Sequence, residues 1–238
     1  MPAAIRPGDP EQVRDLFDRI APSYDRLNDA LSLGLHRLWK RQAIAWLKPE
    51  PGQRLLDLCC GTGDLALVLA EKVRPGGLVL GLDAAAAPLR QARQRAARRP
   101  WLPVEFRQGD ALDTGLADGW ADGAVMAYGL RNLADAPAGL RELRRLLRPG
   151  GRAAVLDFNR VADPQSTTAA FQRFYLRQLV VPLARRAGME AQYAYLEDSI
   201  ARFPCGDEQG QLARDAGFSQ ARHRPLAAGQ MGLLELVA

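Results

Sequence analysis

Short apolar runs alternate with longer stretches of helical periodicity between residues 54 and 158, and no other feature limits the possible folds as strongly. The apolar runs predict strands, and apolar residues at three- and four-residue spacing predict the helices between them. Repeated strand–helix units of this length predict a parallel sheet with right-handed crossovers and helices on both faces. The predicted strands are Arg54–Leu58, Leu78–Leu82, Val104–Gln108, Gly123–Ala127 and Arg152–Phe158, and the predicted helices are Leu65–Val73, Ala84–Arg98 and Ala136–Leu147.

Both ends of the chain extend this alternating core. Residues 1–10 are rich in Pro, Gly and Ala, which predicts a flexible N-terminus. Residues 11–50 are predicted to form a helical lid, and residues 160–205 a helical insertion that faces substrate or membrane, with a long helix at Thr167–Ala187 broken at Pro182. A helix at Glu208–Ala216 and two strands, Ser219–Arg224 and Gly229–Val237, then complete a seven-stranded, Rossmann-like α/β sheet in a single domain over residues 11–238. One strand near the C-terminus is expected to be antiparallel.

Composition and charge exclude several classes of protein. A chain of 238 residues with 47% hydrophobic residues can bury one good core, and 25% charged residues are too few for general disorder. No apolar run approaches the roughly 20 residues of a membrane-spanning helix. The first residues also lack the apolar core of a signal peptide. We therefore expect a cytoplasmic protein that at most contacts the cytoplasmic face of a membrane.

The content of cysteine, histidine and arginine further limits the kinds of site and partner that this protein can have. Three cysteines, of which Cys59 and Cys60 are adjacent, cannot build a disulfide framework, and two histidines without clustered thiols predict no metal site. The cysteines are predicted to be small buried hydrophobes, and His36 and His223 to be packing or surface residues. The net charge of +5 comes almost entirely from arginine and suits an anionic bilayer or nucleic acid. Because no nucleic-acid motif or basic patch interleaved with aromatics is present, no nucleic-acid partner is expected.

A glycine turn, Gly61-Thr62-Gly63, follows the first predicted strand and precedes a helix. Glycines there let the backbone approach a ligand closely, and the ligand would lie over a helix N-terminus at the carboxyl ends of the strands. The next strand ends at Asp83, whose carboxylate can accept two hydrogen bonds from a ribose diol. Asp110 and Ala111 follow the third strand, where they can recognise an adenine amino group.

Two cofactors compete for this turn. The spacing of Gly61 and Gly63 satisfies the dinucleotide fingerprint. Asp57 and Asp64 oppose a pyrophosphate, because each like-charge pair at ~4 Å costs on the order of 4 kcal/mol at an effective dielectric near 20. S-adenosylmethionine has no phosphate and carries a sulfonium and an α-ammonium, so acids at consecutive strand ends favour it. A nicotinamide-dependent oxidoreductase stays as the alternative from another class, and a spectral change with reduced nicotinamide and a quinone would favour it.

The turn resembles that of class I methyltransferases, and other segments resemble the quinone C-methyltransferases of ubiquinone, menaquinone and phylloquinone biosynthesis. The matching segments are LFDRIAPSYD at 16–25, GLHRLWK at 34–40, YGLRNL at 128–133, LRPGG at 147–151 and AGF at 216–218. Within this family, six further segments resemble the phylloquinone branch: LDFNR at 156–160, FYL at 174–176, VVP at 180–182, YAY at 193–195, RFP at 202–204 and GQMG at 229–232. The resemblance implies methylation of a lipid-tailed quinol, the reduced phytyl-bearing naphthoquinol that lacks its ring methyl. Demethylmenaquinol and a ubiquinone precursor stay as alternative substrates.

This sequence departs from the family pattern in places. Cys59 and Cys60 stand where many relatives have smaller residues, and Ala84–Ala87 replace the commoner Phe-Ser after Asp83. Ala127 stands where some members have serine near the cofactor. These changes leave the acids and both glycines of the turn in place.

The chemistry of ring methylation points to a cation near the substrate. A neutral quinol carbon is a poor nucleophile, whereas a phenolate places charge on the adjacent ring carbon. The phenol pKa near 10 must therefore be lowered at the site, which a guanidinium can do. We expect Arg131, after the fourth strand, to be this cation, with a bound water as proton acceptor because arginine stays protonated. Asn132 is expected to hold the quinol oxygen, and the two residues argue against an inactive scaffold.

The resemblance and the apolar pattern supply the remaining predicted contacts. Tyr24 is expected to contact the cofactor from the lid, and Tyr128 to pack under the adenosine or contact substrate. Phe174 and Tyr195 are expected on the substrate side. Arginines flank an apolar stripe around Phe174, which is typical of a helix at a bilayer interface and predicts peripheral membrane contact. The predicted cofactor residues are Tyr24, Asp57, Gly61, Thr62, Gly63, Asp83, Asp110, Ala111 and Ala127. A homodimer and an RNA methyltransferase stay open; salt-sensitive RNA binding would favour the latter.

Overall fold

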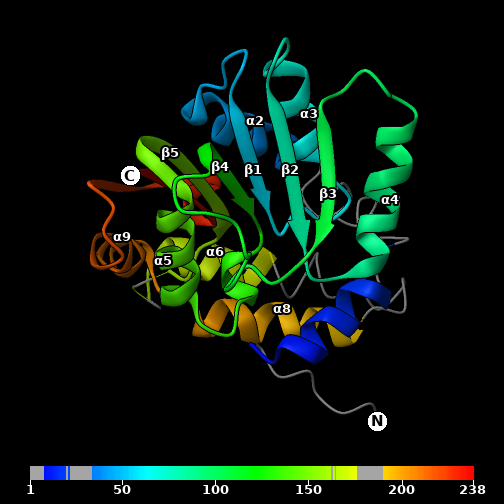
Figure 1. Ribbon diagram of the computed structural model, residues 1–238. Helices are drawn as coiled ribbons and strands as arrows, with labels where there is room; N and C mark the ends of the chain where they lie inside the picture. Colours follow the sequence, from blue (N-terminus) through cyan, green and yellow to red (C-terminus); the bar gives the residue numbers. More distant parts are fainter. Residues whose placement is uncertain (1–7, 20, 22–33, 162, 164, 176–189) are drawn as a thin grey trace.

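A seven-stranded sheet runs through the molecule in the order β3-β2-β1-β4-β5-β7-β6 (Figure 1). The computed structural model describes residues 8–19, 21, 34–161, 163, 165–175 and 190–238. Strands β1 to β5 pair in parallel, whereas β7 runs antiparallel to both β5 and β6, as expected for one strand near the C-terminus. The strands are β1 (Arg54–Leu58), β2 (Leu78–Asp83), β3 (Val104–Gln108), β4 (Ala121–Ala127), β5 (Leu147–Phe158), β6 (Gln220–Leu226) and β7 (Met231–Val237).

Helices cover both faces of the sheet, as the strand–helix alternation predicts. Leu55 and Leu56 are neighbours on β1 whose side chains enter different cores, because successive side chains of a strand point to opposite faces. Leu56 packs with α5 and α9, and Leu55 packs with α2 and α3. The helices are α2 (Leu35–Leu47), α3 (Asp64–Lys72), α4 (Ala86–Ala97), α5 (Ala136–Leu146), α6 (Thr167–Tyr175), α8 (Glu190–Arg202) and α9 (Gly206–Asp215), with 3-10 turns η1 (Leu130–Asn132) and η3 (Ala227–Gly229).

Strand β5 begins five residues before the predicted start, and its pairing with β4 is irregular around Pro149-Gly150-Gly151, where the register shifts from Ala121–Leu147 to Gly123–Arg152. The chain terminus explains this difference. The Gly150 N–H donates to the Ala238 carbonyl, and the Ala238 N–H donates to the Gly151 carbonyl. Pairing with a segment almost 90 residues further along the chain therefore extends β5 beyond the apolar run that predicts it.

The helices that follow β5 differ from the prediction. Helix α8 was not anticipated as a separate element. Of the long helix predicted at Thr167–Ala187, residues 167–175 form α6, and the remainder with Pro182 lies outside the described residues. On α2 the helical period is confirmed, but Leu35 and Leu38 are exposed while His36 is buried.

The carboxyl ends of β1, β2 and β3 meet at one edge of the sheet, where α8 and the helix at residues 10–19 cross (Figure 1). Leu16 of the N-terminal helix packs against Tyr195 of α8, so the two helices cover this edge together. Within the described part of the chain, no helix combines the length and apolar character needed to span a membrane.

Candidate active site

A pocket opens at the covered edge of the sheet and contains about 1170 Å³ of space that no protein atom fills, including solvent at its mouth. Most of the predicted cofactor residues line it, namely Asp57, Gly61, Thr62, Asp83, Asp110, Ala111 and Ala127. Pro10, Val13 and Phe17 of the N-terminal helix also line it, which places that helix over the opening. Tyr24, which was expected to contact the cofactor, lies outside the described residues.

The two glycines of the turn serve different purposes. Both have a positive φ, +55° at Gly61 and +76° at Gly63, which favours glycine at each position. A Cβ on Gly61 would meet no heavy atom within 4 Å, so its backbone is open to a ligand. A Cβ on Gly63 would lie 2.7 Å from the Phe106 ring. Gly63 was predicted to bind the cofactor, but it does not line the pocket and instead lets α3 pack against β3.

Asp83 connects the glycine turn to the second strand. Its carboxylate accepts hydrogen bonds from the Gly61 N–H at 2.8 Å and the Ala85 N–H at 2.9 Å. Burial raises the pKa of this carboxyl, and these backbone donors oppose the rise. Each carboxylate oxygen keeps a further lone pair, so the geometry leaves acceptors for a ribose diol.

A second acidic pair lies beside the start of α3. The buried Asp57 accepts a hydrogen bond from the Ala66 N–H at 2.9 Å, and burial, reinforced by the nearby Asp64, raises its pKa well above the ordinary value. The Lys40 ammonium lies 2.5 Å from the Asp64 carboxylate. Burial acts to raise the pKa of Asp64, but this ion pair outweighs burial and lowers it.

Tyr128 forms the wall of the pocket at the end of β4. Its φ of +62° is uncommon for a residue with a side chain. Arg131 Nη1 at 3.0 Å and Asn132 Nδ2 at 2.7 Å both donate to its carbonyl, which holds this conformation. The Tyr128 ring lies 5.7 Å from Lys40 Nζ and 5.9 Å from the centre of the Phe158 ring.

Arg131 is placed differently from the sequence-based expectation. It lines a second cavity together with Arg160, Arg202 and Phe203, and not the cofactor pocket. Its guanidinium forms a buried ion pair with Asp157 at 2.6 Å, and only 7% of its side chain is exposed. Leu133 and Ala134 line both cavities, so the cavity that contains Arg131 adjoins the cofactor pocket.

Asn132 lines the cofactor pocket, but the protein already uses both ends of its amide. Its nitrogen donates to the Tyr128 carbonyl, and its oxygen accepts a hydrogen bond from the Tyr195 hydroxyl at 2.6 Å. Tyr195 is buried, and burial raises its pKa to about 12, so its hydroxyl stays protonated. These two contacts fix the orientation of the amide and leave its second N–H for the predicted contact with a quinol oxygen.

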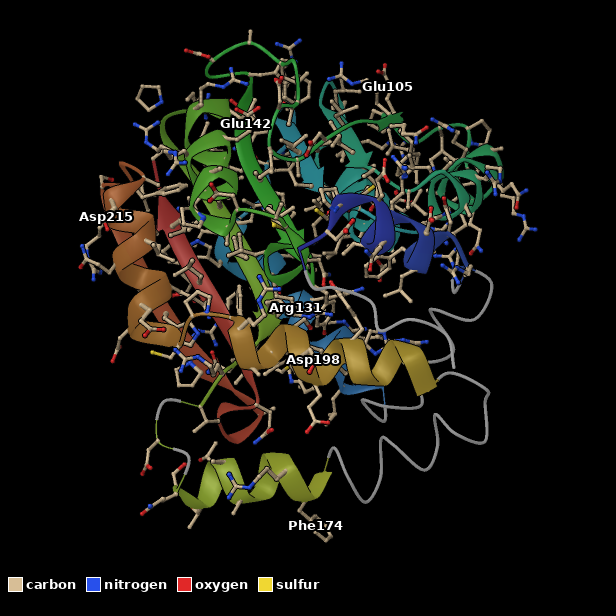
Figure 2. The ribbon with its side chains drawn as sticks, turned by 90° about the horizontal axis from the view of Figure 1, so that it is seen from below. Glu105, Arg131, Glu142, Phe174, Asp198 and Asp215 are labelled. Carbon is tan, nitrogen blue, oxygen red and sulfur yellow. The ribbon has the colours of Figure 1, made fainter. Side chains whose placement is uncertain are left out.

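Two of the predicted residues, Arg131 and Phe174, lie in different parts of the molecule (Figure 2). Arg131 lies near α8, whereas Phe174 stands at the end of α6 and points away from the sheet (Figure 2). The sequence reasoning assigned no role to Lys40 or Asp157, although both belong to segments that carry the resemblance. Cys59 lines the pocket, and burial raises the pKa of its thiol, which fits a packing residue better than a nucleophile.

The lining of the pocket fits S-adenosylmethionine. Four carboxylates face two cations, Lys40 and Arg14, so the pocket favours a positively charged ligand over a pyrophosphate. The backbone at Gly61 is open to such a ligand, and Asp83 and Asp110 lie where ribose and adenine can be recognised. Together with a seven-stranded sheet in which β7 alone is antiparallel, these features define a class I S-adenosylmethionine-dependent methyltransferase.

Solved structures support this fold. A S-adenosylmethionine-dependent methyltransferase from Aquifex aeolicus superposes with a TM-score of 0.60 at 17% identity, covering 96% of this chain and 98% of that one. Phosphoethanolamine N-methyltransferase 2 of Haemonchus contortus, solved in complex with S-adenosyl-L-methionine, gives a TM-score of 0.60 at 18% identity over 79% of this chain and 38% of that one.

The chain belongs to the ubiE/COQ5 methyltransferase family, whose model matches residues 7–234. It is 50% identical to the 2-phytyl-1,4-naphtoquinone methyltransferase of Trichormus variabilis over 224 residues, which cover 94% of this chain and 97% of the relative. It is 44% identical to the chloroplastic 2-phytyl-1,4-beta-naphthoquinone methyltransferase of Arabidopsis thaliana, with 93% and 85% covered. Membership of this methyltransferase family excludes the alternative function, that of a nicotinamide-dependent oxidoreductase.

Proposed function

We propose that this methyltransferase adds a methyl group to a ring carbon of reduced 2-phytyl-1,4-naphthoquinone and so forms phylloquinol. The observation that carries this proposal is the identity of 44 to 50% to relatives named for that substrate, which extends over almost the whole chain. The acidic lining of the first pocket favours S-adenosylmethionine as the methyl donor. The adjoining second cavity gives room for a substrate that the cofactor pocket alone could not hold.

The quinol ring would bind where the two cavities meet, beside Leu133 and Ala134. The second cavity contains about 970 Å³ of unfilled space, solvent at its mouth included, and its wall combines apolar residues with arginines. From this side the Arg131 guanidinium would face a ring hydroxyl and lower its pKa from about 10. Asp157 fixes the guanidinium and also reduces its effect, because the ion pair offsets part of the positive charge.

The proposed reaction replaces a ring proton with a methyl group and releases one proton overall. A quinol hydroxyl gives its proton to a water in the cavity, and Arg131 stabilises the resulting phenolate. The cofactor, when bound, would supply the methyl group and leave as S-adenosylhomocysteine. The ring carbon that receives the methyl then gives its own proton to water, and the oxygen that was deprotonated takes a proton back, which restores the aromatic quinol. Asn132 acts here as a positioning residue, because it links Tyr195 to the Tyr128 carbonyl and so orients the pocket wall.

The N-terminal helix and α6 take the roles expected of a lid and a membrane-facing element in this proposal. The helix at residues 10–19 lines the cofactor pocket through Pro10, Val13 and Phe17. On α6, Phe174 is 59% exposed and Arg173 beside it is exposed, a pairing suited to an anionic bilayer on the cytoplasmic side. A substrate with a phytyl tail reaches a protein most readily from such a surface.

A competition among substrates tests the proposal. The protein is incubated with labelled S-adenosylmethionine and an equimolar set of reduced quinones: 2-phytyl-1,4-naphthoquinone, a demethylmenaquinone and a demethylated ubiquinone precursor. We expect the highest kcat/KM for the phytyl naphthoquinol. A higher kcat/KM for either alternative would overturn the substrate assignment while leaving the class of reaction intact.

A further inference from the structure

The ends of four neighbouring strands indicate which end of the cofactor lies at which end of the pocket. In the sheet order β3-β2-β1-β4, the pocket is lined in turn by Asp110, Asp83, the Gly61 turn and Tyr128. Asp110 and Asp83 suit adenine and ribose, so the adenosine lies toward β3 and β2. The methionyl end of an extended ligand must then lie toward β1 and β4.

The two cations of the pocket lie toward different ends of it. Arg14 is one helical turn before Asp18, whose carboxylate accepts a hydrogen bond from the Ala87 N–H at 2.6 Å at the start of α4, and Asp18 acts electrostatically on Asp83. Arg14 therefore belongs to the ribose end. Lys40 instead pairs with Asp64 and lies over the Tyr128 ring, at the β1 and β4 end.

We propose that Lys40 binds the α-carboxylate of the methionyl group of S-adenosylmethionine, while Asp57 and Asp64 receive its α-ammonium. A carboxylate placed in a partly desolvated pocket requires a positive partner. Between acids alone it would be repelled, so the cation at this end is needed for the ligand to enter. Charges then alternate from Lys40 to the carboxylate, to the ammonium and to the aspartates.

The side chain of Lys40 suits this role in position and chemistry. Only 13% of it is exposed, and its ammonium has three donors, so it can keep Asp64 while accepting a second carboxylate. Three of the 32 basic residues are lysines, and one of these three lines the pocket. A compact ammonium fits between two carboxylates where the planar fork of arginine requires more room.

Titration calorimetry with two ligands tests the proposal without measuring activity. S-adenosylhomocysteine carries the carboxylate, and decarboxylated S-adenosylhomocysteine keeps the adenosine, sulfur and amine but lacks it. The protein should bind the first about 10- to 100-fold more tightly, the range expected for one charge-assisted contact. Lys40→Met should remove most of this preference. Lys72→Met, which removes the same charge from the exposed last turn of α3, should preserve it.

Two results would overturn the proposal. One is an unmodified protein that binds both ligands equally well, and the other is a Lys40→Met variant that weakens both to the same extent. Nuclear magnetic resonance of ¹³C-lysine-labelled protein gives a readout that does not depend on how the variant folds. Of its three Cε signals, that of Lys40 should shift strongly with S-adenosylhomocysteine and only slightly with the decarboxylated ligand. Equal shifts with both ligands would also contradict the assignment.

Discussion

At the scale of single residues, the site depends on the backbone of Tyr128. A non-glycine residue at φ +62° costs on the order of 1–3 kcal/mol and persists only where its surroundings hold it. The Tyr128 carbonyl is held by Arg131 and Asn132, and Asn132 is held in turn by Tyr195. The residues named as catalytic from the sequence thus shape the pocket wall.

Tyr195→Phe tests this support. The variant loses one buried hydrogen bond and leaves the Asn132 oxygen without that donor, so the free energy of unfolding should fall by about 1–2 kcal/mol. We expect kcat to fall more than the affinity for S-adenosylhomocysteine, because Tyr195 does not line the cofactor pocket. Chemical denaturation and calorimetry measure the two effects. An unchanged unfolding free energy together with unchanged kcat would refute the positioning role.

The Arg131–Asp157 pair separates a structural role from an electrostatic one. Arg131→Ala leaves Asp157 buried without its cation and should destabilise the fold by roughly 3–5 kcal/mol. The neutral double variant Arg131→Gln with Asp157→Asn should recover much of that loss and bind the cofactor normally. Its turnover should stay low near pH 7 and rise as the pH approaches the quinol pKa of about 10, because the quinol then ionises without help from a cation. A double variant with the pH–rate profile of the unmodified protein would exclude Arg131 as the stabilising cation.

At the scale of elements, hydrogen bonds to Glu142 connect α5 to the loop that contains Thr114. Its carboxylate accepts from the Thr114 N–H and hydroxyl and from Arg145, and it is largely buried. Although burial opposes ionisation, the Arg145 and Thr114 donors lower its pKa from 4.5 to about 2.

This shift predicts a pH dependence of stability. Because the folded pKa lies below the unfolded one, the stabilisation is fully present above about pH 4.5 and is lost as the pH falls toward 2. The loss amounts to at most about 3 kcal/mol. Urea denaturation from pH 7 to pH 3 should show it, and Glu142→Gln should flatten that part of the curve. An equal acid slope in the variant would show that other carboxylates cause it.

Local pattern predicted some elements better than others, for physical reasons. Strands β1 and β3 match the predicted bounds. Strand β1 is buried and reads as a short apolar run, whereas β3 is an edge strand in which Val104 and Phe106 alternate with polar residues. The start of β5 was missed because it pairs with the chain terminus, and Lys40 was missed because its partner Asp64 is 24 residues away. The acids at the strand ends were found because topology alone brings them together. The placement of Arg131 in a second cavity depends on its pairing with Asp157, which no local pattern shows.

At the scale of the whole molecule, the membrane contact that we propose involves the exposed end of α6. Phe174→Glu should weaken binding to anionic vesicles severalfold in a sedimentation assay, because it replaces an apolar anchor with a repelled charge. Trp101→Glu is the matched control. Trp101 is also exposed but precedes β3, at the opposite end of the strands from the site. Equal losses in both variants would mean that net charge, and not α6, governs the binding.

The most direct test of the account follows the methyl carbon itself. S-adenosylmethionine with a ¹³C-labelled methyl group is supplied with 2-phytyl-1,4-naphthoquinone, either reduced or oxidised, and the product is examined by nuclear magnetic resonance. We predict a labelled methyl bonded to a ring carbon from the reduced substrate and no transfer to the oxidised one. A label bonded to oxygen, or equal transfer to the oxidised quinone, would contradict methylation through a quinolate.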